Sequence, residues 1–251
     1  LEQAGTESAQ QALVKVITDY SRPLKDGMRA IVAMGGVKQP TTESITALWE
    51  MGQYSSGGER QRMANMATFA LGTIGNTMNK ADNPEYASLR SDLMSNAFGG
   101  GDVTQRSNYI TALGNTHDTT LADEVAIFLD DTEPVIRRAA ALSLGSLGID
   151  QVAEKLVSRY NEENNGYVRG AIVESLQSWI KPTDSAMSMF RQTVRTETDE
   201  STRYNIALLL GKNLDKFPEN ESVLMEIIRN EPSKRIRQKA AEALGAHQSQ
   251  P

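Results

Sequence analysis

An arginine recurs through the second half of the sequence at a nearly constant interval. The recurring positions are Arg106, Arg137, Arg169, Arg203 and Arg237, separated by 31, 32, 34 and 34 residues. A leucine follows each arginine by seven residues, at Leu113, Leu144, Leu176, Leu210 and Leu244. A period of this length suits two helices and two short turns, and self-similarity at such periods is typical of repeat architectures. The sequence therefore predicts a stack of helix pairs.

An acidic residue accompanies the arginine in the last four repeats. It lies six residues before the arginine, at Asp131, Glu163, Glu197 and Glu231. This position falls in the turn before the helix, near the positive end of the helix dipole. We expect these acids and the five arginines to form a structural ladder that links each arginine to a neighbouring turn. A row of phosphate-binding arginines is the alternative.

Further positions recur in register with the arginine and the leucine. One column holds Ile136, Val168, Thr202 and Ile236, and another holds Ala140, Ile172, Ile206 and Ala240. With the leucines they repeat at i, i+4 and i+8, so they are predicted to face the core. Glycine follows the leucine in four of the five repeats, which predicts that these helices end in a left-handed residue. The segment from Thr120 to Leu129 has the apolar stripe of a partner helix.

The segment from Asp130 to Leu142 resembles the turn and second helix of HEAT repeats. The resemblance extends from about Gly101 to His247 and implies an all-α fold, an armadillo-like α–α superhelix of about seven helix pairs. The resemblance is structural and implies no specific activity; from the extended surface of such a solenoid we predict a protein-binding scaffold or assembly module. The stretch Ala112–Asn115 with Asp118 and Leu121 is similar to the helical domain of vitellogenin-type lipid-transfer proteins. That second resemblance implies a lipid-carrying role together with domains that this chain does not contain.

The first hundred residues repeat less regularly than the rest. We expect divergent helical repeats over 1–100, regular HEAT-like repeats over 101–247 that continue the same solenoid, and a tail over 248–251. A glycine-rich break at Gly99–Gly101 leaves open a separate N-terminal helical subdomain.

The composition excludes several classes of function. The net charge of −6 and the pI near 5.1 disfavour nucleic acid as the main partner. The chain has no cysteine, and His117 and His247 stand alone, so no metal site or cofactor is predicted. The glycines at Gly72 and Gly75 lack the lysine of a phosphate loop. Because no catalytic constellation is visible, we predict that the chain is not an enzyme.

Targeting and localisation are poorly constrained by the sequence. No run of 18 apolar residues is present, so no transmembrane segment is predicted. The chain begins at Leu1 without a methionine, and we interpret it as a processed product or a fragment, for example of an exported bacterial protein. The sequence therefore does not determine the cellular compartment.

A partner-binding surface is predicted where the second helices of HEAT repeats line the concave side of a solenoid. Two columns of these helices lie off the predicted core, and they vary between repeats. We expect the binding residues to be Arg138, Leu142, Tyr167, Glu174, Tyr204, Leu208, Gln238 and Glu242. The alternatives are the lipid-carrying role, a HEAT-like DNA-repair glycosylase, which would need a basic groove, and a HEAT-type chromophore lyase with a bilin partner, for which no motif is present.

Overall fold

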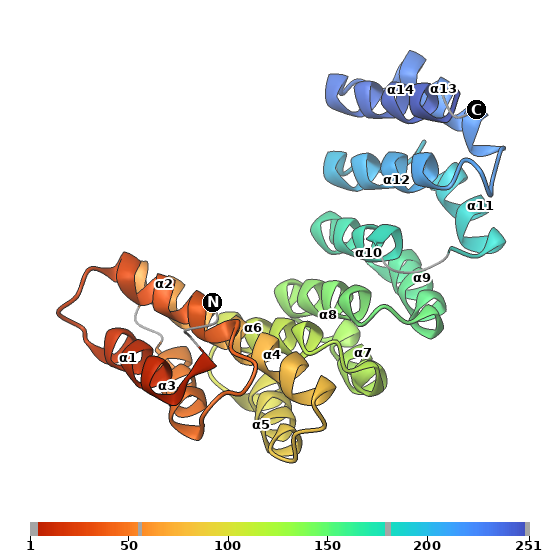
Figure 1. Ribbon diagram of the computed structural model, residues 1–251. Coiled ribbons are helices and arrows are strands. Elements are labelled where there is room, and N and C mark those ends of the chain that lie inside the picture. The colour runs from red at the N-terminus through yellow and green to blue at the C-terminus, as the bar shows by residue number, and fades with distance from the viewer. Residues whose placement is uncertain (1–4, 55–56, 179–181, 249–251) are drawn as a thin grey trace. The chain divides into compact units, whose positions relative to one another are not determined.

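A computed structural model describes residues 5–54, 57–178 and 182–248. Over these ranges the chain forms fourteen α-helices and no β-strand (Figure 1). Consecutive helices pack against each other as seven pairs, from α1 with α2 to α13 with α14. The predicted fold, an all-α solenoid of helix pairs, is confirmed.

Each pair has a first helix and a second helix. The first helices are α1 (Glu7–Thr18), α3 (Thr42–Gly52), α5 (Tyr86–Gly99), α7 (Ala122–Ala126), α9 (Ala153–Glu162), α11 (Asp184–Thr193) and α13 (Asn220–Asn230). The second helices are α2 (Leu24–Gly35), α4 (Gly58–Lys80), α6 (Val103–Asn115), α8 (Pro134–Leu147), α10 (Gly166–Ser178), α12 (Glu200–Lys212) and α14 (Lys234–Gln248). Short 3₁₀ helices η2 (Thr119–Leu121) and η3 (Ile127–Asp130) flank α7, and η4 (Asp150–Val152) precedes α9. The single partner helix expected over 120–129 is therefore divided into three short pieces.

The helices belong to two compact units, Leu1–Leu147 and Gly148–Pro251. In the first unit α2, α4, α6 and α8 stack on one another in chain order. In the second unit α10, α12 and α14 do the same. The glycine-rich break at Gly99–Gly101 lies inside the first unit, where α5 packs on α6. That the regular repeats over 101–247 form one continuous solenoid stays a prediction.

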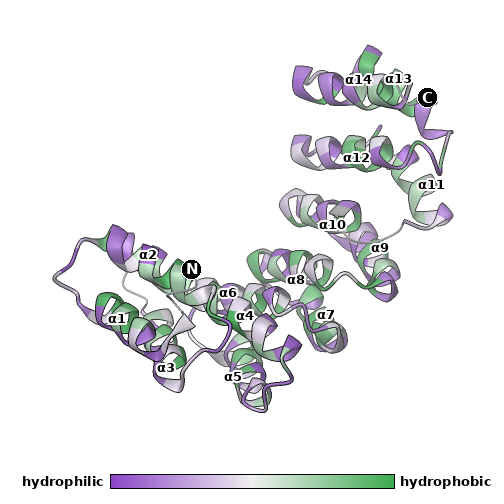
Figure 2. Ribbon diagram, in the orientation of Figure 1, coloured by the Kyte–Doolittle hydropathy of each residue, from purple (hydrophilic) through white to green (hydrophobic). Residues whose placement is uncertain are grey.

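The predicted core columns are buried. Ile136, Val168, Thr202 and Ile236 are fully inaccessible to solvent, as are Ala140, Ile172, Ile206 and Ala240. All five leucines of the repeat are buried too, with Leu244 the most accessible at 6%. Each helix carries hydrophobic and hydrophilic residues along its length (Figure 2). The periodicity of the sequence thus identified the core of the second helices correctly.

Several second helices begin at side chains that cap them. The carboxylate of Asp102 accepts the N–H of Gln105 at 2.9 Å, while the amide oxygen of Gln105 accepts the N–H of Asp102 at 3.0 Å. This reciprocal pair satisfies two N–H groups that a helix terminus leaves unpaired. Asp199 caps α12 by accepting the N–H of Thr202 at 2.7 Å. The first residue of α8 is Pro134. Proline lacks the backbone N–H, but at this position an N–H would have no partner within the helix.

The glycines that follow the leucines do not end their helices, so that prediction was wrong. Gly114, Gly145, Gly211 and Gly245 all lie inside helices, and none has a positive φ. A Cβ on Gly114 would lie 2.7 Å from the Cα of Ser143, and one on Gly211 would lie 2.6 Å from the Cβ of Ala243. These two glycines therefore allow the next second helix to approach closely. After α8 the left-handed residue is Gly148, with φ of 70°.

No helix in the described ranges is both long and apolar enough to cross a membrane.

Candidate functional site

The acid of each repeat organises the turn before its second helix. In the clearest example, Glu197 Oε1 accepts the N–H of Asp199 at 2.9 Å, and the carbonyl of Glu197 accepts Nη1 of Arg203 at 3.2 Å. The same two bonds recur at the other three acids, Asp131, Glu163 and Glu231, with Arg137, Arg169 and Arg237 as the donors to the carbonyls. The six-residue spacing between acid and arginine therefore corresponds to one turn, which these two hydrogen bonds hold together.

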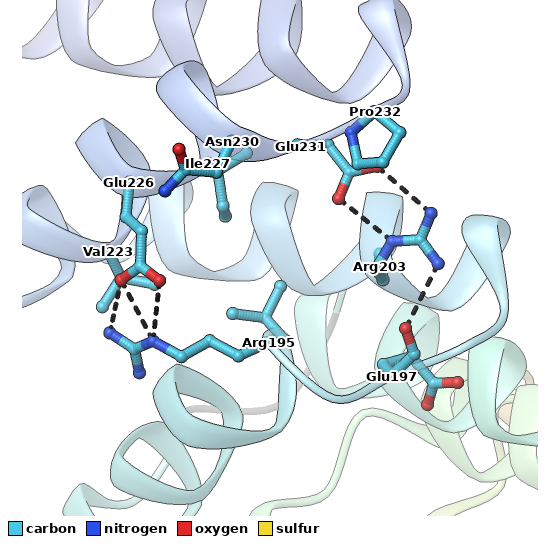
Figure 3. A pocket seen from close by; sticks show the side chains of 10 residues that line it. Arg195, Glu197, Arg203, Val223, Glu226, Ile227, Asn230, Glu231 and Pro232 are labelled. Carbon is cyan, nitrogen blue, oxygen red and sulfur yellow. Dashed lines mark hydrogen bonds and ion pairs between the residues drawn. The ribbon is translucent and has the colours of Figure 1, made fainter.

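The arginine side chain also reaches the acid of the following repeat. Arg106 Nη2 lies 2.7 Å from Asp131 Oδ2. Arg169 binds Glu197 through Nε at 2.8 Å and Nη2 at 2.6 Å. Arg203 binds Glu231 in the same bidentate way, at 3.0 and 3.1 Å (Figure 3). In these last two pairs one guanidinium thus holds its own turn and the next turn together.

Glu197 is one of the two most deeply buried of these carboxylates, together with Glu163. Its side chain is only 2% exposed, and it accepts the hydroxyl of Tyr160 at 2.9 Å in addition to Arg169. Burial alone would raise the pKa of Glu197, but the hydrogen bonds from Arg169, the Asp199 N–H and Tyr160 outweigh it, and the pKa lies below its usual value. Burial and the neighbouring carboxylate raise the pKa of the Tyr160 hydroxyl. Glu197 is therefore ionised at neutral pH and its partner Tyr160 is not.

The turn geometry repeats within a segment that a family comparison also detects. Residues 92–177 match the family model for HEAT repeats. This segment carries HEAT repeats. A comparison with curated proteins gives no match. The matched HEAT segment contains the ladder residues Arg106, Asp131, Arg137, Glu163 and Arg169, and the same turn geometry recurs beyond it around Glu197 and Glu231.

The eight predicted partner-binding residues are placed at different depths. Arg138 and Leu142 are half-buried on α8 in the first unit. In the second unit Tyr167, Glu174, Gln238 and Glu242 are exposed on α10 and α14, whereas Tyr204 and Leu208 are half-buried on α12. The four exposed residues are accessible to a partner without rearrangement.

Tyr204 makes a contact between successive helix pairs. The guanidinium of Arg235, on α14, lies 4.0 Å from the centroid of the Tyr204 ring, which is cation–π geometry. Gly170 occupies the same column on α10, where it is buried and its carbonyl accepts the side-chain amide of Asn205 at 2.9 Å. This column therefore points along the stack towards the next second helix. The sequence identified it as lying off the core but did not show this direction.

Leu208 lies in the other predicted column and lines a hollow between α12 and α14. The hollow has a volume of about 350 Å³, and its apolar lining is Leu208, Gly211, Leu214, Ala243 and Ala246. Polar side chains pair around it, with Lys239 Nζ 2.6 Å from Glu242 Oε2 and His247 Nδ1 2.9 Å from Asp215 Oδ1. We call this feature the second-helix hollow.

A second hollow of about 330 Å³ lies beside the ladder and was not foreseen from the sequence (Figure 3). Its apolar lining is Val194, Val223 and Ile227, and we call it the turn-side hollow. Arg195 Nη2 binds Glu226 Oε2 at 2.7 Å on its rim, and this pair is about 40% exposed. Both charged pairs of this hollow, Arg195–Glu226 and Arg203–Glu231, are matched within the chain. Arg195 and Glu226 lie 31 residues apart in the sequence, which is one repeat length. This spacing is the sequence signal from which the pair could have been predicted.

Proposed function

We propose that this HEAT-repeat chain is a protein-binding scaffold, and that the partner lies on the second helices of the second unit. HEAT-type solenoids commonly bind proteins along extended surfaces of this kind. The observation that supports this surface most is the second-helix hollow, where an apolar lining is combined with a charged rim. A hollow with apolar walls and a few polar groups is typical of sites that receive one anchoring side chain.

The neighbouring residues fit an extended contact. Tyr167 is 60% exposed at the start of α10, and Glu174 is exposed further along the same helix. Gln238 and Glu242 are exposed on α14 and share a hydrogen bond of 3.1 Å. A partner segment with one aliphatic anchor and flanking basic groups would match Leu208 together with these carboxylates. Most residues at such an interface would contribute shape complementarity, and a few anchoring side chains would contribute most of the binding energy.

The surface can be tested with a double substitution, Leu208→Ser with Glu242→Lys. Because Leu208 is half-buried and Glu242 is exposed, we expect the melting temperature to change by only a few degrees. Capture of the partner that the wild-type chain retains should fall at least tenfold. Quantitative pull-down under matched conditions measures this.

The matched control is Val32→Ser with Glu50→Lys, in the first unit. Val32 is 66% exposed on α2 and Glu50 is exposed in the last turn of α3, so the control also replaces one aliphatic residue with serine and one acid with lysine. The control should retain the partner. Equal capture by both variants and wild type would rule out this surface, and equal loss in both variants would show that capture depends on general surface charge.

A further inference from the structure

A third hollow lies between two first helices of the first unit, on α5 and beside Glu124 of α7. Its volume is about 580 Å³, and Ala87, Met94 and Phe98 form its apolar wall. We call it the α5 hollow. The spacing of these three residues, i, i+7 and i+11, places them on one face of α5. At the rise of an α-helix they span about 16 Å, or roughly three helical turns.

Contacts near the start and the end of α5 hold the walls of the α5 hollow in place. Near the start, Arg90 Nη2 lies 3.1 Å from Glu124 Oε1, and Arg90 Nη1 donates to Thr120 Oγ1 at 3.1 Å. Near the end, the rings of Phe98 and Phe128 pack with their centroids 4.7 Å apart. A ligand would therefore meet walls that are already ordered, and less conformational entropy would be lost on binding.

Phe98 is an exposed apolar residue at a position that is polar or buried in the other repeats. Eight positions before the ladder arginine, successive repeats hold Phe98, Leu129, Asn161, Arg195 and Arg229. Leu129 is buried and the last three are exposed, whereas Phe98 is 50% exposed. Ile127, three residues after Glu124, is 58% exposed. Packing within the repeats leaves much of both apolar side chains in solvent, and a group of such side chains usually marks an interaction site.

The segment that contains this face is strongly acidic. Residues 86–133 contain eight acidic and two basic residues, a net charge of −6, which equals the net charge of the whole chain. Both basic residues form ion pairs within the segment. Asp123 and Asp130 are exposed on either side of Ile127 in the sequence. The charge therefore favours a basic partner and disfavours nucleic acid or an anionic membrane surface.

We propose that the α5 hollow binds a basic amphipathic helix of another protein, about three turns long. Large apolar side chains on one face of that helix pack against Met94 and Phe98, and its Lys or Arg residues lie near Asp123 and Asp130. A helix in an apolar groove is a common mode of recognition, with anchors at i, i+4 and i+7.

The α5 hollow is inside the stack, between the third and fourth helix pairs. Because repeats stack end to end, a further repeat at either end of the chain would not cover it. It also belongs to the first unit, whereas the proposed partner-binding surface belongs to the second. The two proposals can therefore fail independently.

The experiment measures binding of two synthetic peptides to the whole chain by fluorescence anisotropy. The basic peptide is a labelled helix of about 18 residues, with Leu and Phe at i, i+4 and i+7 of one face and Lys on the flanks. The acidic peptide has Glu in place of each Lys. The basic peptide should bind roughly tenfold more tightly than the acidic one, and its binding should weaken as salt is added.

Phe98→Ser tests the apolar wall and should weaken binding of the basic peptide roughly tenfold. The matched control is Tyr20→Ser, which removes an aromatic side chain of similar exposure, 58%, from the loop between α1 and α2. The control should bind the peptide as wild type does. Melting temperatures of both variants show whether the fold is kept, since Phe98 also packs on Phe128.

Asp123→Asn with Asp130→Asn tests the charge without touching the apolar wall. Because both acids are exposed, we expect the fold to be kept, and binding of the basic peptide should weaken roughly threefold and depend less on salt. Asp150→Asn with Asp184→Asn is the matched control, since both are exposed in the second unit, and it should bind as wild type does.

Weaker binding in both test variants, with both controls at the wild-type level, supports the proposal. Equal binding of the two peptides, or wild-type binding by Phe98→Ser, overturns it. If Leu208→Ser and not Phe98→Ser removes binding, the peptide lies in the second-helix hollow, and only the proposal for the α5 hollow fails. A dimer of the whole chain that Phe98→Ser dissociates in sedimentation would identify the occupant as a second copy and would also overturn the proposal.

Discussion

At the scale of single residues, the repeating arginine and acid act as a buried, polar joint. Arg169 and Glu197 show its full form, with two direct bonds, a capped turn and a tyrosine hydroxyl on the same carboxylate. Charge-assisted bidentate pairs are stronger and more directional than neutral hydrogen bonds. Removing one partner would leave the other charge buried and unpaired, which is more costly than the net contribution of the bond.

The joint should make stability sensitive to acid. Because hydrogen bonds hold the folded pKa of Glu197 below its unfolded value near 4.5, its contribution is complete above pH 4.5 and is lost as pH falls through the folded pKa. We expect Glu197→Gln to cost about 1–3 kcal/mol at pH 7 and to lose less stability than wild type below pH 4.5. Urea unfolding from pH 7 to pH 3 measures both. Glu226→Gln, which removes the acid of the exposed Arg195 pair, is the control, and its stability should depend on pH almost as that of wild type does. If the stability of Glu197→Gln falls with pH in parallel with that of wild type, the role assigned to Glu197 is contradicted.

The leucine column makes a separate prediction. Leu144 is fully buried on α8, and truncation to alanine should cost about 2–5 kcal/mol through lost burial and a cavity. Leu142 is half-exposed on the same helix, so Leu142→Ala should cost about 1 kcal/mol or less. Chemical denaturation of both variants compares them directly. A neutral Leu144→Ala would show that the core is assigned to the wrong face.

At the scale of helices, the glycine after the leucine sets how closely successive second helices approach. The sequence interpretation assigned these glycines to helix ends, because glycine is common there. The choice between a helix end and a close approach depends on where the neighbouring helix lies. That position is a tertiary property, and the one-dimensional pattern around Leu113 and Gly114 does not contain it.

The two roles can be separated by one substitution made at two sites. Gly114→Ala places a Cβ 2.7 Å from the Cα of Ser143, so the helices must move apart, and we expect a loss of about 1–3 kcal/mol. Gly245→Ala places its Cβ where no atom of the described residues lies within 4 Å, and alanine favours the helix by about 0.5–1 kcal/mol. The sign of the change should therefore differ between the two variants in thermal melts. Destabilisation at both sites would indicate that backbone conformation, not helix approach, requires the glycine.

At the scale of the whole molecule, the sequence predicted the features that recur in every repeat and did not predict the features that occur at a single site. The period, the helix pairs and the buried columns at Ile136, Ala140 and Leu144 follow from residue spacing alone. The direction of the Tyr204 column does not, because it depends on the rotation of α12 relative to α14. The turn-side hollow was not predicted either. Its lining combines residues of α13 with the segment that follows α11, and only three-dimensional packing brings them together.

The proposed partner-binding surface lies on the second helices of the second unit. It is tested most directly by placing the same photo-crosslinking amino acid at two glutamate positions of that unit. Glu242 borders the second-helix hollow and Glu226 borders the turn-side hollow. Mass spectrometry of the irradiated complex should find the captured partner crosslinked from position 242 and little crosslinked from position 226. Crosslinks chiefly from position 226, or equally from both, would contradict the account.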